Sequence, residues 1–201
     1  LRARLNLPEH KFLIVLASRI SHEKDPETVL QAVASARGHG LDAVLLNLGG
    51  GYQEFLALAS SLGIADAHSW VVGRPAVHPM HELADHFRAA DLLVQGSLEE
   101  GLGLSPLEAL ACETPVVATA VGGLAAHPGP YASLAPRRDA EAMAKAILEV
   151  EANPCPAKMR AQHGREYVRR YWSRERAFRE LRRTLFAMAA RQDPLETREA
   201  A

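Results

Sequence analysis

The sequence predicts an α/β fold, a Rossmann-like doubly wound parallel sheet followed by C-terminal helices. Two observations predict it. Several short runs are apolar on successive residues, a pattern typical of strands that are buried on both faces. These runs alternate with segments that have helical spacing, as expected for parallel strands joined by crossover helices. A chain of 201 residues is long enough for one such domain.

The predicted elements follow one another in strand–helix order. The strands are expected at Phe12–Ala17, Ala43–Leu48, Ser69–Val72, Leu92–Gln95 and Val116–Thr119. The helices between them are expected at Pro26–Arg37, Gln53–Leu62, Pro79–Ala89 and Pro106–Cys112. Beyond Asp139 the pattern predicts helices only, over Asp139–Ala152, Pro156–Tyr171 and Arg174–Arg191.

The start of the first helix is well marked. Asp25 can accept a hydrogen bond as the N-cap, Pro26 suits the first helical position, and Glu27 suits the positive end of the helix dipole. We assign residues 1–192 to one domain, in which residues 1–10 are the remnant of an interdomain connection. Residues 193–201 are expected to form a frayed tail.

Composition excludes several classes of protein. Apolar residues make up 48% of the chain, and the formal net charge is −1, so there is no electrostatic reason to expect a nucleic-acid partner. Cys112 and Cys155 show no paired spacing, which fits a reduced, cytoplasmic location. No apolar run reaches the roughly 20 residues of a membrane-spanning helix, and Leu1–Leu7 has no signal-peptide core.

Glycine and charge gather where the predicted strands end. The segments are Gly49–Gly51, Gly73-Arg74, Gly96–Gly103 and Val121–Gly123. In an open parallel sheet, ligands bind beyond the carboxyl ends of the strands, near the switch point in strand order. One glycine-rich turn is a weak signal, but four turns at the same edge predict a ligand-binding site.

Two basic residues follow the first strand. Lys24 comes just before a helix N-terminus, where the helix dipole disfavours a cation unless a negative group lies nearby. A phosphate would be such a group, and Arg19 on the same loop adds a guanidinium fork that suits a diphosphate. The alternative is that Lys24 is a solvated surface lysine.

Glu100 and Glu108 are the acidic candidates. Glu100 lies in a glycine-bounded loop, where its carboxylate could accept hydrogen bonds from the hydroxyl pairs of a ribose or hexose. Backbone amides of Gly101–Leu104 could hold phosphate oxygens. For Glu108 a purely structural alternative stays open, because Ser105-Pro106-Leu107-Glu108 matches a capping box.

These segments together resemble the C-terminal, donor-binding domain of glycosyltransferase family 4, the "group 1" class with the two-domain GT-B fold. The resemblance rests on Glu100-Gly101-Leu102-Gly103-Leu104-Ser105-Pro106-Leu107-Glu108, on Thr114-Pro115-Val116-Val117 and on Val121-Gly122-Gly123. Upstream, Ser18-Arg19-Ile20 and Lys24-Asp25-Pro26 look like the family's Arg…Lys loop. Gly49, Gly51, Gly73, Ala90-Asp91-Leu92 and Tyr171-Trp172-Ser173 follow in order, so the resemblance covers most of residues 11–190.

The resemblance implies a role for each matching residue. Arg19 and Lys24 would bind the diphosphate of a nucleoside-diphosphate sugar and stabilise its charge as it leaves. Glu100 would meet hydroxyls of the transferred sugar, with amides of Gly101, Leu102, Gly103 and Leu104 nearby. Glu108 would hold the ribose, and Gly73 and Arg74 would lie near the base. The family needs neither a metal nor a cofactor, and this chain has no Asp-x-Asp motif.

Some positions depart from the family pattern. Glu113 stands where the family usually has glycine, Leu102 replaces a common aromatic residue, and Gly96-Ser97 replaces Pro-Ser. The glutamate that usually follows Gly122-Gly123 is missing. That last change puts the usual conformation of this loop in doubt, though not donor binding itself.

The function that the resemblance implies is transfer of a sugar to an acceptor hydroxyl with retention of anomeric configuration. The enzyme would be a hexosyltransferase-like glycosyltransferase, and this chain is expected to be inactive without the N-terminal acceptor domain of the GT-B fold. The alternative is a non-catalytic nucleotide-sugar-binding module or subunit. Peripheral membrane contact through the arginine-rich last helix stays open.

Other classes fit less well. A dehydrogenase needs the third glycine of Gly-x-Gly-x-x-Gly, which does not follow Gly49–Gly51, and a P-loop needs Gly-Lys-Ser/Thr. His78, His81 and His86 lack a further ligand set for zinc.

Overall fold

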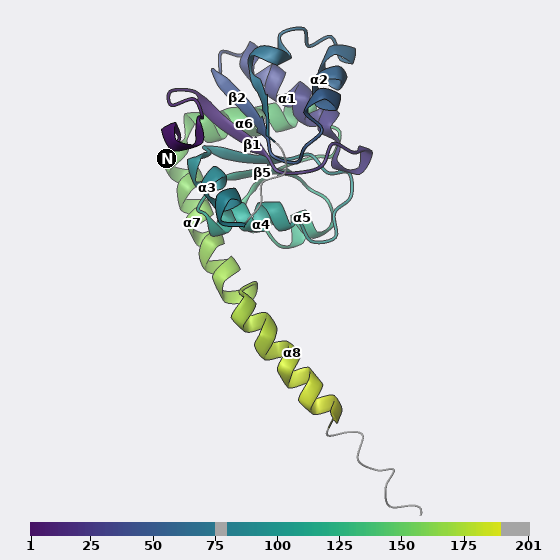
Figure 1. The fold of residues 1–201 in the computed structure, drawn as a ribbon, viewed down its shortest axis with the longest axis vertical. Helices are drawn as coiled ribbons and strands as arrows, with labels where there is room; N and C mark the ends of the chain where they lie inside the picture. The colour runs from purple at the N-terminus through teal and green to yellow at the C-terminus, as the bar shows by residue number, and fades with distance from the viewer. Residues whose placement is uncertain (75–79, 190–201) are drawn as a thin grey trace, which may run out of the picture. The chain divides into compact units, whose positions relative to one another are not determined.

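The computed structural model describes residues 1–74 and 80–189 (Figure 1). They form a six-stranded, all-parallel sheet with the order β3-β2-β1-β4-β5-β6. The strands are β1 (Phe12–Leu16), β2 (Ala43–Asn47), β3 (Val71–Gly73), β4 (Leu92–Gln95), β5 (Val116–Thr119) and β6 (Ser133–Ala135). This is the strand order of a Rossmann fold, and the predicted fold class is confirmed.

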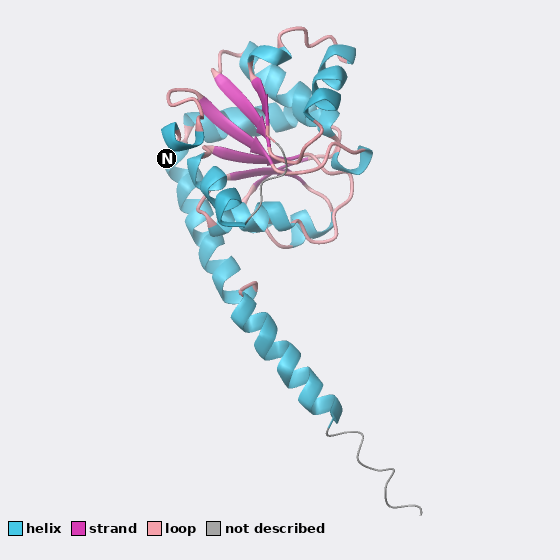
Figure 2. Ribbon diagram, in the orientation of Figure 1, coloured by secondary structure: helices cyan, strands magenta, loops and turns pink. Residues whose placement is uncertain are grey.

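Helices cover both faces of the sheet, as Figure 2 shows. The helices are α1 (Pro26–Gly38), α2 (Tyr52–Ser61), α3 (Met80–Ala89), α4 (Leu104–Ala111), α5 (Gly122–Ala126), α6 (Ala140–Ala152), α7 (Pro154–Tyr171) and α8 (Arg174–Ala189). Helix α1 packs against α6, and α3 packs against α4. The short 3-10 turns are η1 (Ala3–Leu5), η2 (His22–Lys24), η3 (Ala67–Ser69) and η4 (Gly129–Tyr131).

The strands are buried because their residues are apolar on both faces. Leu13, Ile14, Val15 and Leu16 of β1 are at most 1% exposed, and every residue of β2 is buried. Burying one such side chain contributes about 1.5–3 kcal/mol, so the sheet forms a rigid platform for the loops at its edge.

Helix α1 begins as the sequence predicts. The Asp25 carboxylate accepts hydrogen bonds from the Thr28 backbone N–H at 3.3 Å and from the Thr28 hydroxyl at 2.6 Å. These bonds satisfy one free donor of the first turn and fix the direction in which the chain leaves the preceding loop.

Helix α4 begins differently from the prediction. It starts at Leu104, and its N-cap is Gly103 in the left-handed region, with φ at +81°. The Ser105 hydroxyl donates to the Ala17 carbonyl at 2.8 Å and does not cap the helix. The capping-box interpretation is therefore wrong, because the serine is used to join α4 to the end of β1.

Two further elements were not predicted. Strand β6 has three residues and no β-branched side chain, so the sequence offers no periodicity from which to predict it. Helix α5 is only five residues long and begins with two glycines. Glu113, which replaces the family's usual glycine, has a φ of +61°, a conformation that favours glycine. Its carboxylate pairs with Arg165 at 2.6 Å.

The described residues group into two compact units, Leu1–Arg165 and a second unit that begins at Glu166. The boundary falls within α7. The apolar side chains of α8 are exposed, namely Phe178, Leu181, Leu185, Phe186 and Met188. Within residues 1–74 and 80–189, no helix is long and apolar enough to cross a membrane. The predicted tail and His78 lie outside the described residues.

Candidate functional site

The candidate site lies where the strand order reverses. Strands β1 and β4 are neighbours in the sheet, but the chain runs from β1 toward β2 on one side and from β4 toward β5 on the other. The loops that follow these two strands, residues 17–25 and 96–103, therefore diverge and leave room for a ligand between them.

A pocket of about 400 Å³ opens between these loops. It is lined by Ala17, Ser18, Arg19, Lys24, Gln95, Glu100, Leu102, Gly103, Leu104, Ser105 and Pro106. Two cationic residues, one carboxylate and the N-terminus of α4 thus share one pocket. The structure brings together the predicted Arg19, Lys24, Glu100 and Leu102–Leu104.

Lys24 and Glu100 form an ion pair at the centre of this pocket. The Lys24 Nζ atom lies 2.5 Å from Glu100 Oε2, and the two side chains are only 19% and 17% exposed. The Ser97 hydroxyl lies 3.3 Å from the same carboxylate oxygen. The negative group that the sequence analysis required beside Lys24 is therefore present within the protein itself.

Arg19 is held more loosely. Its guanidinium lies 3.4 Å from Glu23 Oε1, and its side chain is 78% exposed. Chiefly a hydrogen bond from its own backbone holds the pKa of the Glu23 carboxyl below its usual value. Exposed pairs of this kind contribute little to stability, so Arg19 can exchange Glu23 for another anion at little cost.

Glu108 lies beside the pocket without lining it. It follows Leu104 and Ser105 by four and three positions along α4, so it shares their side of the helix. The side chain is half-buried and has no hydrogen-bond or ion-pair partner among the residues that the structure describes. Burial raises the pKa of the Glu108 carboxyl. With the capping box excluded, nothing within the described protein satisfies this carboxylate.

Gly73 and Arg74 are not brought into the pocket. The Arg74 guanidinium donates to the backbone carbonyls of Leu5 at 3.1 Å and Asn6 at 3.3 Å. A Cβ atom on Gly73 would lie 2.3 Å from the Tyr52 ring, so this glycine is required by packing. Both bonds come from Nη2, and the Arg74 Nε atom is buried with no hydrogen-bond partner among the described residues.

The glycines near Glu100 hold two loops together. A Cβ atom on Gly122 would lie 2.4 Å from the Glu100 carbonyl oxygen, and one on Gly123 would lie 2.2 Å from the Gly101 carbonyl oxygen. The Gly123 N–H donates to the Glu100 carbonyl at 2.9 Å. These glycines fix the backbone of the Glu100 loop, whereas a Cβ on Gly101 would meet nothing within 4 Å.

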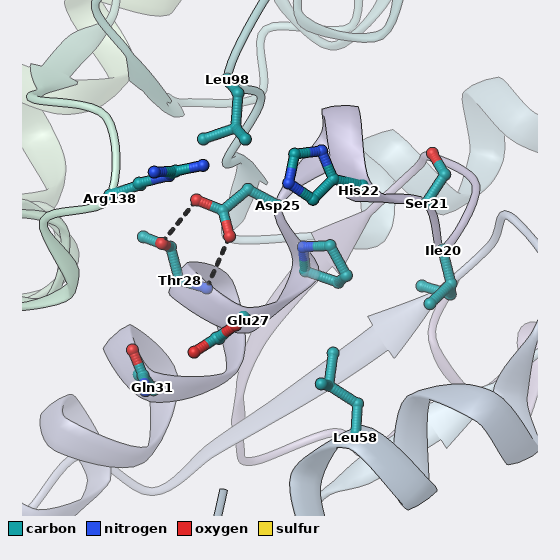
Figure 3. A pocket seen from close by; sticks show the side chains of 11 residues that line it. Ile20, Ser21, His22, Asp25, Glu27, Thr28, Gln31, Leu58, Leu98 and Arg138 are labelled. Atoms are coloured by element: carbon teal, nitrogen blue, oxygen red, sulfur yellow. Dashed lines mark hydrogen bonds between the residues drawn. The ribbon is translucent and has the colours of Figure 1, made fainter.

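Two other hollows flank the pocket. One of about 630 Å³ lies beside the N-terminus of α1, and Figure 3 shows Asp25, Thr28, His22 and Arg138 around it. The other, of about 1150 Å³, is lined by residues that include Glu99, Glu100, Gly101 and Arg137. Gly101, which the sequence predicts for the site, therefore faces this second hollow. Among the described residues, no three His, Cys, Asp or Glu side chains gather where they could hold a metal ion.

Three polar residues of the pocket region were missed by the sequence analysis. Ser18 and Gln95 line the pocket, and Ser97 lies behind Glu100. A signal was present for Gln95, because an amide at the end of the apolar run Leu92–Gln95 has no role in a core strand.

Residues 1–168 match the family model described as "Glycosyl transferases group 1". Among the curated relatives, D-inositol 3-phosphate glycosyltransferase 1 of Catenulispora acidiphila is 42% identical over 134 residues. That alignment covers 61% of this chain and 31% of the relative. The chain thus spans about a third of the length of the curated relatives it matches.

Solved structures share the fold. The C-terminal domain of the glycosyl transferase group 1 family protein LpcC from Francisella tularensis has a TM-score of 0.73 at 19% identity and covers 86% of this chain and 91% of its own. Anabaena Alr3699/HepE, solved in complex with UDP and glucose, has a TM-score of 0.80 at 19% identity and covers 92% of this chain and 51% of its own.

Proposed function

Because the chain belongs to the family of group 1 glycosyl transferases, we propose that its pocket between the β1 and β4 loops binds the nucleoside-diphosphate sugar of a retaining glycosyltransferase. One observation carries the proposal: Arg19, Lys24, Glu100 and the N-terminus of α4 line one pocket at the switch point of the sheet. A diphosphate needs the cations and the helix amides, and a sugar needs the carboxylate.

The two basic residues act on the leaving diphosphate. Lys24 uses one N–H donor on Glu100, and its ammonium has two more for phosphate oxygens. Arg19 gives up its weak contact with Glu23 to reach the same group. The barrier to transfer is the charge separation between an oxocarbenium-like sugar and the departing diphosphate, and fixed donors at such a charge are worth about 3–4 kcal/mol each.

Glu100 and the start of α4 act on the transferred sugar and the phosphates. The first two amides of α4, those of Leu104 and Ser105, have no partner within the helix, and both residues line the pocket. Glu108 accepts hydrogen bonds from the ribose hydroxyls, which satisfies its otherwise unpartnered carboxylate. Arg74 does not line this pocket, and its Nη2 atom donates to the Leu5 and Asn6 carbonyls, so the proposal gives it no role at the diphosphate.

The whole enzyme transfers the sugar to an acceptor hydroxyl without a metal ion. The acceptor site comes from the N-terminal domain of the GT-B fold, so residues 1–201 alone bind donor and do not transfer it. The similarity to Alr3699/HepE, whose structure holds UDP and glucose, supports a nucleotide-sugar donor.

A thermal-shift panel tests the proposal. The chain is heated with UDP, GDP or ADP and with UDP-glucose, GDP-mannose or ADP-glucose, with and without EDTA. A ligand at 100 times its dissociation constant adds about 2.7 kcal/mol to the free energy of unfolding. We expect one nucleotide series to raise the melting temperature, with no effect of EDTA. No shift with any nucleotide would overturn the proposal. Donor turnover by the chain alone would overturn the requirement for the second domain.

A further inference from the structure

A chain of hydrogen bonds runs along the wall of the pocket, from the end of β4 to the loop after β1. The Gln95 Nε2 atom donates to the Ser97 hydroxyl at 2.7 Å, and that hydroxyl lies 3.3 Å from Glu100 Oε2. Lys24 Nζ reaches the same oxygen from the other side. Gln95 and Ser97 are 2% and 0% exposed, so the hydrogen bond between them is shielded from water.

The donor and the acceptor in each of these hydrogen bonds follow from the protons that the groups carry. A carboxylate can only accept hydrogen bonds, so the Ser97 hydroxyl donates its one hydrogen bond to Glu100. The hydroxyl oxygen must then accept from the Gln95 amide. The backbone of Ser97 is fixed as well, because the Thr119 hydroxyl donates to the Ser97 carbonyl at 2.6 Å. Ser97 therefore has one orientation, set by Gln95 and Thr119.

These hydrogen bonds engage only one of the two carboxylate oxygens of Glu100. Oε2 accepts from both Ser97 and Lys24, whereas no partner is found for Oε1 among the described residues. A carboxylate held by one oxygen cannot rotate freely. Its second oxygen is then presented to a ligand in one direction.

Burial of the Gln95 amide lowers the stability of the protein and therefore calls for a functional explanation. Its Oε1 atom is buried without a hydrogen-bond partner among the residues described. An unsatisfied buried acceptor is destabilising, and a leucine or methionine at this position would not leave one. Since the neighbouring residues Leu92, Leu93 and Val94 are apolar, the amide is unexplained by the core.

We propose that Gln95 is a positioning residue for the donor sugar: through Ser97 it orients the Glu100 carboxylate toward the sugar hydroxyls. The inference rests on the proposed function. It assigns Gln95 to recognition of the sugar and leaves recognition of the nucleoside diphosphate to Arg19, Lys24 and Glu108. The variant Gln95→Met, which keeps the length of the side chain and removes the amide, isolates this role.

Isothermal titration of the 201-residue chain measures the dissociation constants of UDP and UDP-glucose, GDP and GDP-mannose, and ADP and ADP-glucose. In the series that binds, the preference for the sugar ester over the bare diphosphate should fall by about three- to tenfold in Gln95→Met, as loss of one oriented hydrogen bond implies. Affinity for the bare diphosphate should not change. The melting temperature should not fall, because an unsatisfied acceptor is removed.

Two further variants separate positioning from a structural effect. Gln53→Met makes the same replacement at an exposed position of α2 and should leave the preference unchanged. In a Glu100→Gln background, Gln95→Met should cause no additional loss, because its effect passes through Glu100. An equal loss for diphosphate and sugar ester, no loss at all, or an undiminished loss in the Glu100→Gln background would each overturn the proposal. Wild-type chain that binds no nucleotide would overturn the proposed function, and this inference with it.

Discussion

Lys24 Nζ and Glu100 Oε2 lie 2.5 Å apart, although the two residues are 76 positions apart in the chain. Each belongs to a loop that leaves the sheet at the switch point between β1 and β4. The pair joins a group suited to phosphate with a group suited to sugar hydroxyls. Glu100 offsets the charge of Lys24 beside the α1 N-terminus, and Lys24 in turn holds one oxygen of Glu100 in place.

Arg19→Ala tests the proposed role at the leaving group. In the whole enzyme, we expect turnover to fall by about 10²–10³-fold, the usual loss when one donor to a developing charge is removed. The free energy of unfolding should change little, because the pair with Glu23 is exposed. Steady-state kinetics with the donor identified by thermal shift measure the effect.

Arg4→Ala is the matched control for Arg19→Ala. Arg4 also forms an exposed ion pair, with Asp85 at 2.6 Å, and it does not line the pocket. Its removal should leave turnover unchanged. Equal turnover of Arg19→Ala and the unaltered enzyme would contradict the proposed role of Arg19 at the leaving group.

Glu108→Gln should make the protein more stable and a weaker binder of nucleotides. Burial raises the pKa of this carboxyl, so the native state binds more protons than the unfolded state above the unfolded pKa. Stability therefore falls as pH rises from about 4.3, the ordinary value for glutamate, through the raised native pKa. Glutamine cannot ionise, and this part of the pH dependence should disappear.

Two measurements check the Glu108 prediction. Melting curves at several pH values should show a higher melting temperature for Glu108→Gln at neutral pH and no difference in acid. The increase should not exceed 2–4 °C, the shift that about 1 kcal/mol produces in a chain of this size. Titration with the nucleoside diphosphate should show about 10- to 100-fold weaker binding, as for loss of hydrogen bonds to a charged group. Unaltered nucleotide affinity would contradict the ribose assignment.

Gly123→Ala should destabilise the loop that carries Glu100. The added Cβ atom would lie 2.2 Å from the Gly101 carbonyl oxygen, a backbone atom that moves only if the loop moves. Overpacking of this kind costs about 1–3 kcal/mol. Chemical denaturation measures the loss, and Gly101→Ala serves as the control because its Cβ atom would meet nothing within 4 Å. A stable Gly123→Ala variant would show that the two loops are not tightly packed.

Ser105→Ala tests the contact that replaces the expected capping box. Loss of the 2.8 Å hydrogen bond to the Ala17 carbonyl should lower the free energy of unfolding by about 0.5–1.5 kcal/mol. Ser60→Ala, which removes an exposed hydroxyl bonded to its own helix, should have almost no effect in the same denaturation experiment. If the two variants were equally stable, the contact between α4 and β1 would contribute nothing.

Local sequence patterns predicted the elements that carry their own periodicity. Strands β1, β2, β4 and β5 and helix α1 were found within one or two residues of their observed bounds, because apolar runs and helix caps are local signals. Strand β6 and helix α5 carry no such signal. Both exist because β5 and the Glu100 loop offer them backbone partners, such as the Glu100 carbonyl that accepts from Gly123.

At the site, the amino-acid order alone specifies which residue types follow β1 and β4, and therefore that cations and carboxylates gather at one edge of the sheet. Which of these side chains pair with one another depends on the folded chain. It pairs Lys24 with Glu100, directs Arg74 to the Leu5 and Asn6 carbonyls, and leaves Glu108 without a partner among the described residues. The physical reason is that hydrogen bonds and ion pairs act over about 3 Å between residues far apart in the chain, a separation that composition, spacing and periodicity do not encode.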